Sequence, residues 1–167
     1  MAERPEARVL DVRQAAMLAA AYRQEGRTVV FTNGCFDLLH RGHVDYLQRA
    51  RDLGDLLVVG VNSDASVRQL KGPARPILPE ADRAAVLAAL RAVDAVVIFA
   101  EPTAEALVAA IRPDVYVKGG DWGEGRRLPP EAAVVREYGG RIEYLAYLPD
   151  RSTSELIARI RGGRADS

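Results

Sequence analysis

The chain has 167 residues, of which 49% are hydrophobic, and its 23 basic side chains balance its 23 acidic ones. This length and composition are typical of one globular domain with a sizeable core, and the zero net charge argues against nucleic acid or an anionic membrane as a partner. No apolar stretch approaches the roughly 20 residues of a membrane span, and the charged N-terminus lacks the core of a signal peptide. With a single cysteine, Cys35, no internal disulfide can form, so we expect a cytoplasmic protein.

Apolar runs alternate with amphipathic segments along most of the chain. We expect helices at residues 11–24, 41–53, 64–70, 79–91, 103–111, 131–138 and 152–161. We expect strands at residues 28–32, 56–61, 95–99, 114–117 and 141–146. Strands rich in Val, Ile and Leu that alternate with helices predict a doubly wound, Rossmann-like α/β fold, a single domain with a five-stranded parallel sheet. We expect a helical segment at 1–26 packed on a domain at 27–161, and a flexible tail at 162–167.

Two unusual loops follow predicted strands. In doubly wound sheets, ligands bind beyond the carboxyl ends of the strands, where the strand order reverses. His40 and His43, the only histidines, follow the first strand and open a helix. Free backbone N–H groups and the helix dipole attract anions there, and residues three apart share a helix face. Gly42 between them lowers helix stability, which indicates close backbone approach. We interpret this loop as a site for the phosphate chain of a nucleotide.

Other readings of the two histidines remain. A zinc protease site needs a spacing of four with a glutamate between the histidines, and this chain has neither. Two histidines on a solvated helix face are the structural alternative. The glycine fingerprint of NAD domains and the Gly-Lys-Ser/Thr phosphate loop are both absent.

Lys71 and Lys118 are the only lysines, and both precede glycine in predicted loops. Because ammonium and guanidinium groups are not interchangeable, lysine here suggests a chosen function, although chance is the alternative. Lys118 begins the run Lys-Gly-Gly-Asp-Trp after the fourth strand, which we interpret as substrate-binding rather than as an ordinary turn with a rim aromatic. The run Arg151 to Glu155 is typical of a capping box. Its hydroxyl groups and its arginine also fit a polyphosphate site.

Three further residues have a functional and a structural interpretation. Arg83 can reach phosphate, or it can pair with Glu80 on a solvated helix face. Asp37 can help to hold a metal–nucleotide complex, or it can stabilise its turn. Cys35 reads as a small buried residue.

These motifs carry a family resemblance. The stretch Thr32 to His43 resembles the His-x-Gly-His signature of the nucleotidyltransferase superfamily of the cytidylyltransferases. The motifs Asn62-Ser63-Asp64, Leu70-Lys71-Gly72, Arg75-Pro76, Lys118 to Asp121 and Ser152-Thr153 extend it. The ordered set, over about residues 27–161, is most similar to the adenylyltransferases that act on a heptose 1-phosphate. Ser154 stands where relatives often have threonine.

The resemblance implies transfer of AMP from ATP, bound with Mg²⁺, to D-glycero-β-D-manno-heptose 1-phosphate, with release of pyrophosphate. The acceptor oxygen is already anionic, so catalysis needs positioning and charge stabilisation rather than a strong base. The implied catalytic residues are His40, His43 and Lys71. The implied nucleotide and phosphate ligands are Thr32, Asn33, Gly34, Cys35, Phe36, Gly42, Lys118, Gly120, Asp121, Arg151, Ser152, Thr153 and Ser154. The implied substrate-binding residues are Asp37, Asn62, Asp64, Arg83 and Trp122, and no side-chain cluster is expected to hold a metal.

Many relatives fuse this domain to a sugar kinase, so the short chain predicts a stand-alone form that needs a separate heptose kinase. The resemblance also implies a homodimer. Because Asp121-Trp122 is similar to glycerol-3-phosphate cytidylyltransferases, another base and acceptor are an alternative. A non-catalytic nucleotide sensor is an alternative of another class. An aminoacyl-tRNA-synthetase-like protein is disfavoured because the chain has no basic excess and its last motif lacks the expected lysine.

Overall fold

A computed structural model describes residues 8–120, 122, 127–149 and 152–162. Its strands are β1 (Val9–Leu10), β2 (Val29–Gly34), β3 (Leu56–Asn62), β4 (Ala95–Phe99), β5 (Val115–Gly119) and β6 (Arg141–Leu145). Its helices are α1 (Val12–Gln24), α2 (Arg41–Arg51), α3 (Asp64–Lys71), α4 (Glu80–Ala88), α5 (Glu105–Ile111), α6 (Ala132–Glu137) and α7 (Thr153–Gly162). Within this described part, no helix is long and apolar enough to cross a membrane.

One parallel sheet organises the chain, with the strand order β1-β4-β3-β2-β5-β6. After β2 the chain moves outward through β3 to β4, then returns to place β5 on the other side of β2. The order therefore reverses between β2 and β5. This is the point at which a doubly wound sheet leaves a crevice beyond the strand ends.

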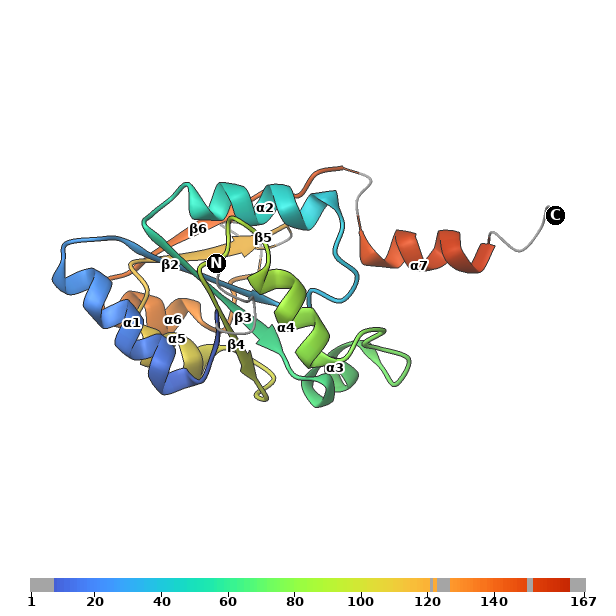
Figure 1. Cartoon of the computed structure of the whole chain (residues 1–167), viewed down its shortest axis with the longest axis horizontal. Helices are drawn as coiled ribbons and strands as arrows, with labels where there is room; N and C mark the ends of the chain where they lie inside the picture. The colour runs from blue at the N-terminus through green and yellow to red at the C-terminus, as the bar shows by residue number, and fades with distance from the viewer. Residues whose placement is uncertain (1–7, 121, 123–126, 150–151, 163–167) are drawn as a thin grey trace, which may run out of the picture.

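Helices cover both faces of the sheet (Figure 1). Residues of α2 and α4 pack with Val30, Leu57 and Val59 in one core cluster. Residues of α1, α5 and α6 pack with their neighbours Phe31 and Val58 in the other. Successive strand residues thus enter opposite clusters, as the period-2 alternation of a strand requires. In contrast, α7 extends away from the sheet and buries none of its residues (Figure 1).

The prediction of a parallel α/β sheet is confirmed, but the number of strands was wrong: the described residues form six strands rather than five. The additional strand, β1, has only two residues and pairs with β4 at the sheet edge. Two residues are too few to produce a recognisable strand pattern. The helix predicted to start at Pro79 begins one residue later with Pro79 as its N-cap, and it ends at Ala88 rather than near Arg91.

Candidate active site

A cavity of about 550 Å³ opens at the carboxyl ends of β2 and β5, where the strand order reverses. Asn33 and Gly34 enter it from the end of β2, and Lys118 from the end of β5. Because the two strands are hydrogen-bonded neighbours, loops that lie 85 residues apart share one cavity. The structure therefore brings the histidine loop and the Lys118 loop together, as the sequence predicts.

The two histidines occupy the first turn of α2 with their rings stacked, the ring centroids 3.9 Å apart. His40 is the N-cap, and its Nδ1 accepts a hydrogen bond of 3.1 Å from the Gly42 N–H. The His43 Nδ1 accepts a long bond of 3.4 Å from the His40 N–H. Because each Nδ1 is an acceptor, a neutral ring carries its proton on Nε2. Only His43 of the pair lines the cavity, so His43 presents a donor to a ligand there.

Burial, and then the neighbouring His40, lower the pKa of His43 from 6.5 to about 4. His43 is therefore neutral at pH 7. An anionic ligand opposes this shift by favouring the imidazolium form. The neutral His43 imidazole can thus donate a hydrogen bond to a ligand on which negative charge develops.

This lowered pKa predicts an acid sensitivity of the fold. Between pH 6.5 and about 4, His43 binds more protons in the unfolded chain than in the folded one, so stability falls as the pH falls through this range. We expect urea unfolding at pH 7.5 and 5.0 to show a larger loss of stability in the wild type than in His43→Gln. Equal losses in both proteins would contradict the assignment.

On the β5 side, polar side chains form a short chain of contacts. The Asn33 Oδ1 accepts hydrogen bonds from the Tyr116 hydroxyl (2.8 Å) and from Lys118 Nζ (3.2 Å). The ammonium group also lies 5.5 Å from the centre of the Trp122 ring, an arrangement that favours a cation–π interaction. Burial lowers the pKa of Lys118, while the Glu131 carboxylate opposes this shift. Lys118 is thus a partly desolvated donor on the cavity wall.

The glycines after Lys118 allow Tyr147 to pack against this loop. Gly120 has φ +67, a left-handed conformation that favours glycine. A Cβ on Gly119 or Gly120 would lie within 2.4 Å of the Tyr147 ring, so that ring would have to move. Tyr147 itself lines the cavity. The glycine pair therefore helps to shape this wall.

Hydroxyl groups reach the cavity from the start of α7. Thr153 and Ser154 line it, and the Thr153 hydroxyl donates to the Leu38 carbonyl at 3.4 Å. Ser152 and Glu155 form the reciprocal contacts of a capping box: the Glu155 N–H donates to the Ser152 Oγ at 3.1 Å, and the Ser152 N–H donates to the Glu155 carboxylate. The capping interpretation thus describes Ser152, while Thr153 and Ser154 line the cavity.

The β3 side of the cavity is cationic. Lys71, at the end of α3, and Arg75 line it together with Asn62. The Asn62 amide donates to the Ser66 hydroxyl at 2.9 Å, which fixes its orientation. This wall can receive a second anionic group beside the one that faces His43.

Asp37 lines the cavity, but its carboxylate binds groups of the protein itself. It pairs with Arg75 Nε at 2.6 Å and accepts from the N–H groups of Ile77 and Leu78. Burial alone would raise the pKa of Asp37, but these hydrogen bonds outweigh it and lower the pKa. The turn-stabilising interpretation therefore describes Asp37 better than the metal–nucleotide one.

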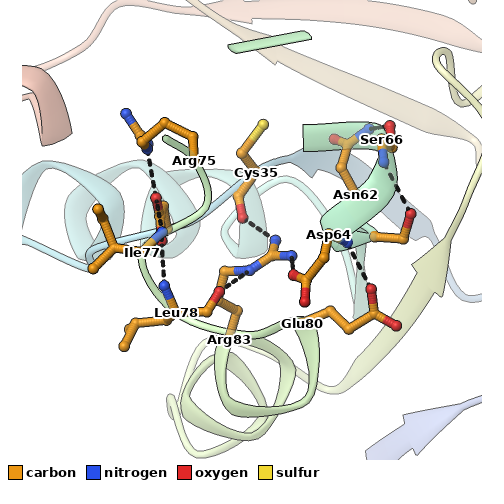
Figure 2. A network of polar contacts seen from close by, with 11 residues as sticks. Cys35, Asn62, Asp64, Ser66, Arg75, Ile77, Leu78, Glu80 and Arg83 are labelled. Carbon is orange, nitrogen blue, oxygen red and sulfur yellow. Dashed lines mark hydrogen bonds and ion pairs between the residues drawn. The ribbon is translucent and has the colours of Figure 1, made fainter. Parts of the chain in front are cut away.

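Arg83 does not line the cavity, and its side chain is fully buried. Figure 2 shows its guanidinium group between three segments. It donates to the carbonyls of Cys35 (2.6 Å) and Leu78 (3.0 Å) and to the Asp64 carboxylate (2.7 Å). Asp64, outside the cavity lining as well, also donates its N–H to the Glu80 carboxylate. The solvated ion pair with Glu80 considered for Arg83 is therefore wrong, because the side chain is buried and donates to Leu78, Cys35 and Asp64 instead.

Several other implied ligands make contacts within the protein or lie outside the cavity lining. The Thr32 hydroxyl lies 2.7 Å from that of Tyr46, which donates to the Val117 carbonyl and so joins β2, α2 and β5. Thr32, His40, Gly42, Gly120 and Ser152 do not line the cavity, whereas Cys35 and Phe36 do. Burial raises the pKa of the Cys35 thiol. Asp121 and Arg151 lie outside the described residues.

Several lining residues were not predicted from the sequence, among them Tyr46, Thr103, Arg127, Pro130, Glu131 and Tyr147. Most sit in predicted helices or loops without a recognisable motif, and only the fold brings them to the cavity. The described part of the chain holds no cluster of three His, Cys, Asp or Glu side chains that could bind a metal ion.

Comparison with known proteins identifies the family of the chain. The cytidylyltransferase-like family matches residues 31–159. The chain therefore belongs to the cytidylyltransferase-like family and is a nucleotidyltransferase.

Two relatives, each called "Bifunctional protein HldE", illustrate the similarity. The protein of Syntrophotalea carbinolica is 56% identical over 83% of this chain, and that of Streptomyces coelicolor is 54% identical over 96%. The chain spans only 28% and 34% of their lengths. A solved structure, the lipopolysaccharide core biosynthesis protein from Thermoplasma volcanium, matches with a TM-score of 0.60 and 30% identity, over 74% of this chain and 98% of that one.

Proposed function

We propose that the chain transfers AMP from ATP to D-glycero-β-D-manno-heptose 1-phosphate and releases pyrophosphate. The observation that carries this proposal is that one cavity is lined by a neutral histidine donor and by the cationic side chains Lys71, Arg75 and Lys118. The similarity to the HldE proteins and the resemblance of the ordered motifs to heptose 1-phosphate adenylyltransferases support the substrates.

In the proposed reaction an oxygen of the acceptor phosphate attacks the α-phosphorus of ATP. A new phosphorus–oxygen bond forms as the bond to the β-phosphate breaks, and the electron pair leaves with pyrophosphate. The acceptor oxygen is already an anion, so no side chain has to remove a proton. The protein lowers the barrier by aligning the groups and by stabilising the developing charge.

Each wall has a proposed part in this reaction. His43 donates from Nε2 to the α-phosphate, and His40 holds that ring by stacking and by its backbone N–H. Lys71 and Arg75 bind the acceptor phosphate, and Thr153 and Ser154 bind the β- and γ-phosphates. Lys118 and Trp122 line the nucleoside or sugar side. Mg²⁺ accompanies ATP as part of the substrate.

Pyrophosphate release tests this proposal. The protein is assayed with Mg²⁺, the heptose 1-phosphate and each of ATP, CTP, GTP and UTP, with glycerol 3-phosphate as the alternative acceptor. We expect release only with ATP and the heptose 1-phosphate. Release with CTP and glycerol 3-phosphate would instead identify a cytidylyltransferase. Tight nucleotide binding without release for any pair would identify a sensor.

A further inference from the structure

Glu131 places a buried carboxylate at the cavity of a site otherwise suited to anions. The residue is 2% exposed and belongs to the cavity lining. Its Oε1 accepts a hydrogen bond of 2.8 Å from the Ala104 N–H. Its Oε2 is buried without a hydrogen-bond partner. Buried polar atoms are rarely left unpaired, because losing water without replacement is unfavourable. An oxygen of this kind beside a cavity indicates a donor supplied by a ligand.

The neighbouring groups leave this oxygen to a ligand. The Tyr116 hydroxyl lies beside the Glu131 carboxylate, and burial followed by this carboxylate raises the pKa of Tyr116. Its one proton is donated to Asn33 Oδ1 at 2.8 Å. The Glu131 charge acts on Lys118, yet the Lys118 ammonium group donates to Asn33, and the described residues show no ion pair between Lys118 and Glu131. Asp37, the other carboxylate of the described lining, is fully engaged by Arg75 and two backbone N–H groups. Glu131 therefore offers the carboxylate acceptor that the protein does not use.

The chemistry of Glu131 and Lys118 limits the kind of ligand group that can bind to both. A carboxylate oxygen accepts hydrogen bonds and repels phosphate, whereas the Lys118 ammonium group only donates. A group that satisfies both must donate and accept, as a hydroxyl does. An exocyclic base amine only donates effectively, and a carbonyl only accepts.

We propose that Glu131 and Lys118 together bind a sugar-ring hydroxyl of a substrate, with Glu131 accepting its proton and Lys118 donating to its oxygen. This inference rests on the proposed function, which brings two sugars to the cavity: the ribose of the nucleotide and the acceptor sugar. Glu131 is then a specificity residue for hydroxylated substrates. It takes no part in bond making, because the acceptor oxygen is already an anion and needs no base.

Glu131→Gln isolates this role. The glutamine carbonyl can still accept from the Ala104 N–H, while its amide replaces the free acceptor by a donor. Asp114→Asn is the matched control, because the Asp114 carboxylate likewise accepts a backbone N–H, from Val29 at 2.8 Å, but at the start of β5. Equilibrium titration with ATP, 2′-deoxy-ATP, 3′-deoxy-ATP and ITP needs no turnover. It therefore remains informative if the heptose 1-phosphate proves not to be the acceptor.

We expect the wild type and Asp114→Asn to bind one deoxy-ATP about 10- to 100-fold more weakly than ATP, as for a hydrogen bond to a charged group. Glu131→Gln should bind ATP weakly and lose that discrimination. If the ribose hydroxyls show no such coupling, a KM for the sugar 1-phosphate raised at least 10-fold in Glu131→Gln, with kcat retained, assigns the hydroxyl to the acceptor.

Two results would overturn the inference. One is a Glu131→Gln protein that is less stable but unchanged in nucleotide discrimination and in acceptor KM, which would make Glu131 purely structural. The other is loss of discrimination between ATP and ITP in the variant, which would assign Glu131 to the base. If the variant does not fold, equal binding of ATP and both deoxy nucleotides by the wild type, with an acceptor KM unaffected by removal of sugar hydroxyls, overturns it as well.

Discussion

Replacing His43 by alanine should lower kcat by about 10²- to 10³-fold, the loss that follows removal of one preorganised donor to a developing negative charge. Of the two histidines, only His43 lines the cavity. Its Nδ1 accepts a hydrogen bond from the His40 N–H, so its Nε2–H can donate to a bound ligand. Because the donor acts most strongly on the charge that develops in the transition state, kcat and kcat/KM should fall together.

The measurement is steady-state pyrophosphate release, together with circular dichroism to show that the variant is folded. Val44→Ala is the matched control, since Val44 is the next residue of α2 and is 46% exposed. It should behave like the wild type. Turnover of His43→Ala within a few-fold of the wild type would remove His43 from the catalytic role. A large rise in KM with kcat retained would make it a ground-state ligand only.

The site can be located from the sequence because the informative residues follow predicted strands. Lys118 stands directly after a predicted strand, and His40 and His43 open the helix that follows another one. Parallel strands bring their carboxyl ends to one edge of the sheet. Adjacency of β2 and β5 then follows from the doubly wound order, in which the first strand lies centrally. Residues that stand in a motif and at a strand end are therefore accessible to prediction.

The positions of Arg83 and Glu131, in contrast, depend on how the elements pack in three dimensions. Arg83 lies in a helix whose sequence is compatible with a solvated arginine, yet its side chain is fully buried. Its partners Cys35 and Asp64 lie 48 and 19 residues away in the chain. Glu131 likewise has a partner far away in the chain, because Ala104, which donates to it, is 27 residues distant. No local pattern encodes such pairs, because each requires the packed arrangement of two elements.

Replacing Arg83 by methionine should reduce the free energy of unfolding by about 3 kcal/mol, since removing one partner of a buried ionic network leaves the others unpaired. The carbonyls of Cys35 and Leu78 would each lose a donor, and Asp64, whose side chain is 25% exposed, would recover only part of its hydration. Arg83→Lys should lose most of the same stability, because one ammonium group cannot span three acceptors as a planar guanidinium fork does.

The network in Figure 2 joins the loop after β2, the segment before α4 and the start of α3. All three segments adjoin the β3 side of the cavity, so activity should fall with stability in both Arg83 variants. Arg68→Met, an exposed position on α3, serves as the control for urea unfolding and for turnover. A phosphate-binding arginine would give a different pattern: wild-type stability in Arg83→Met with a raised KM, and partial rescue by lysine. That outcome would return Arg83 to the ligand-binding wall and would require the guanidinium group to leave its buried position.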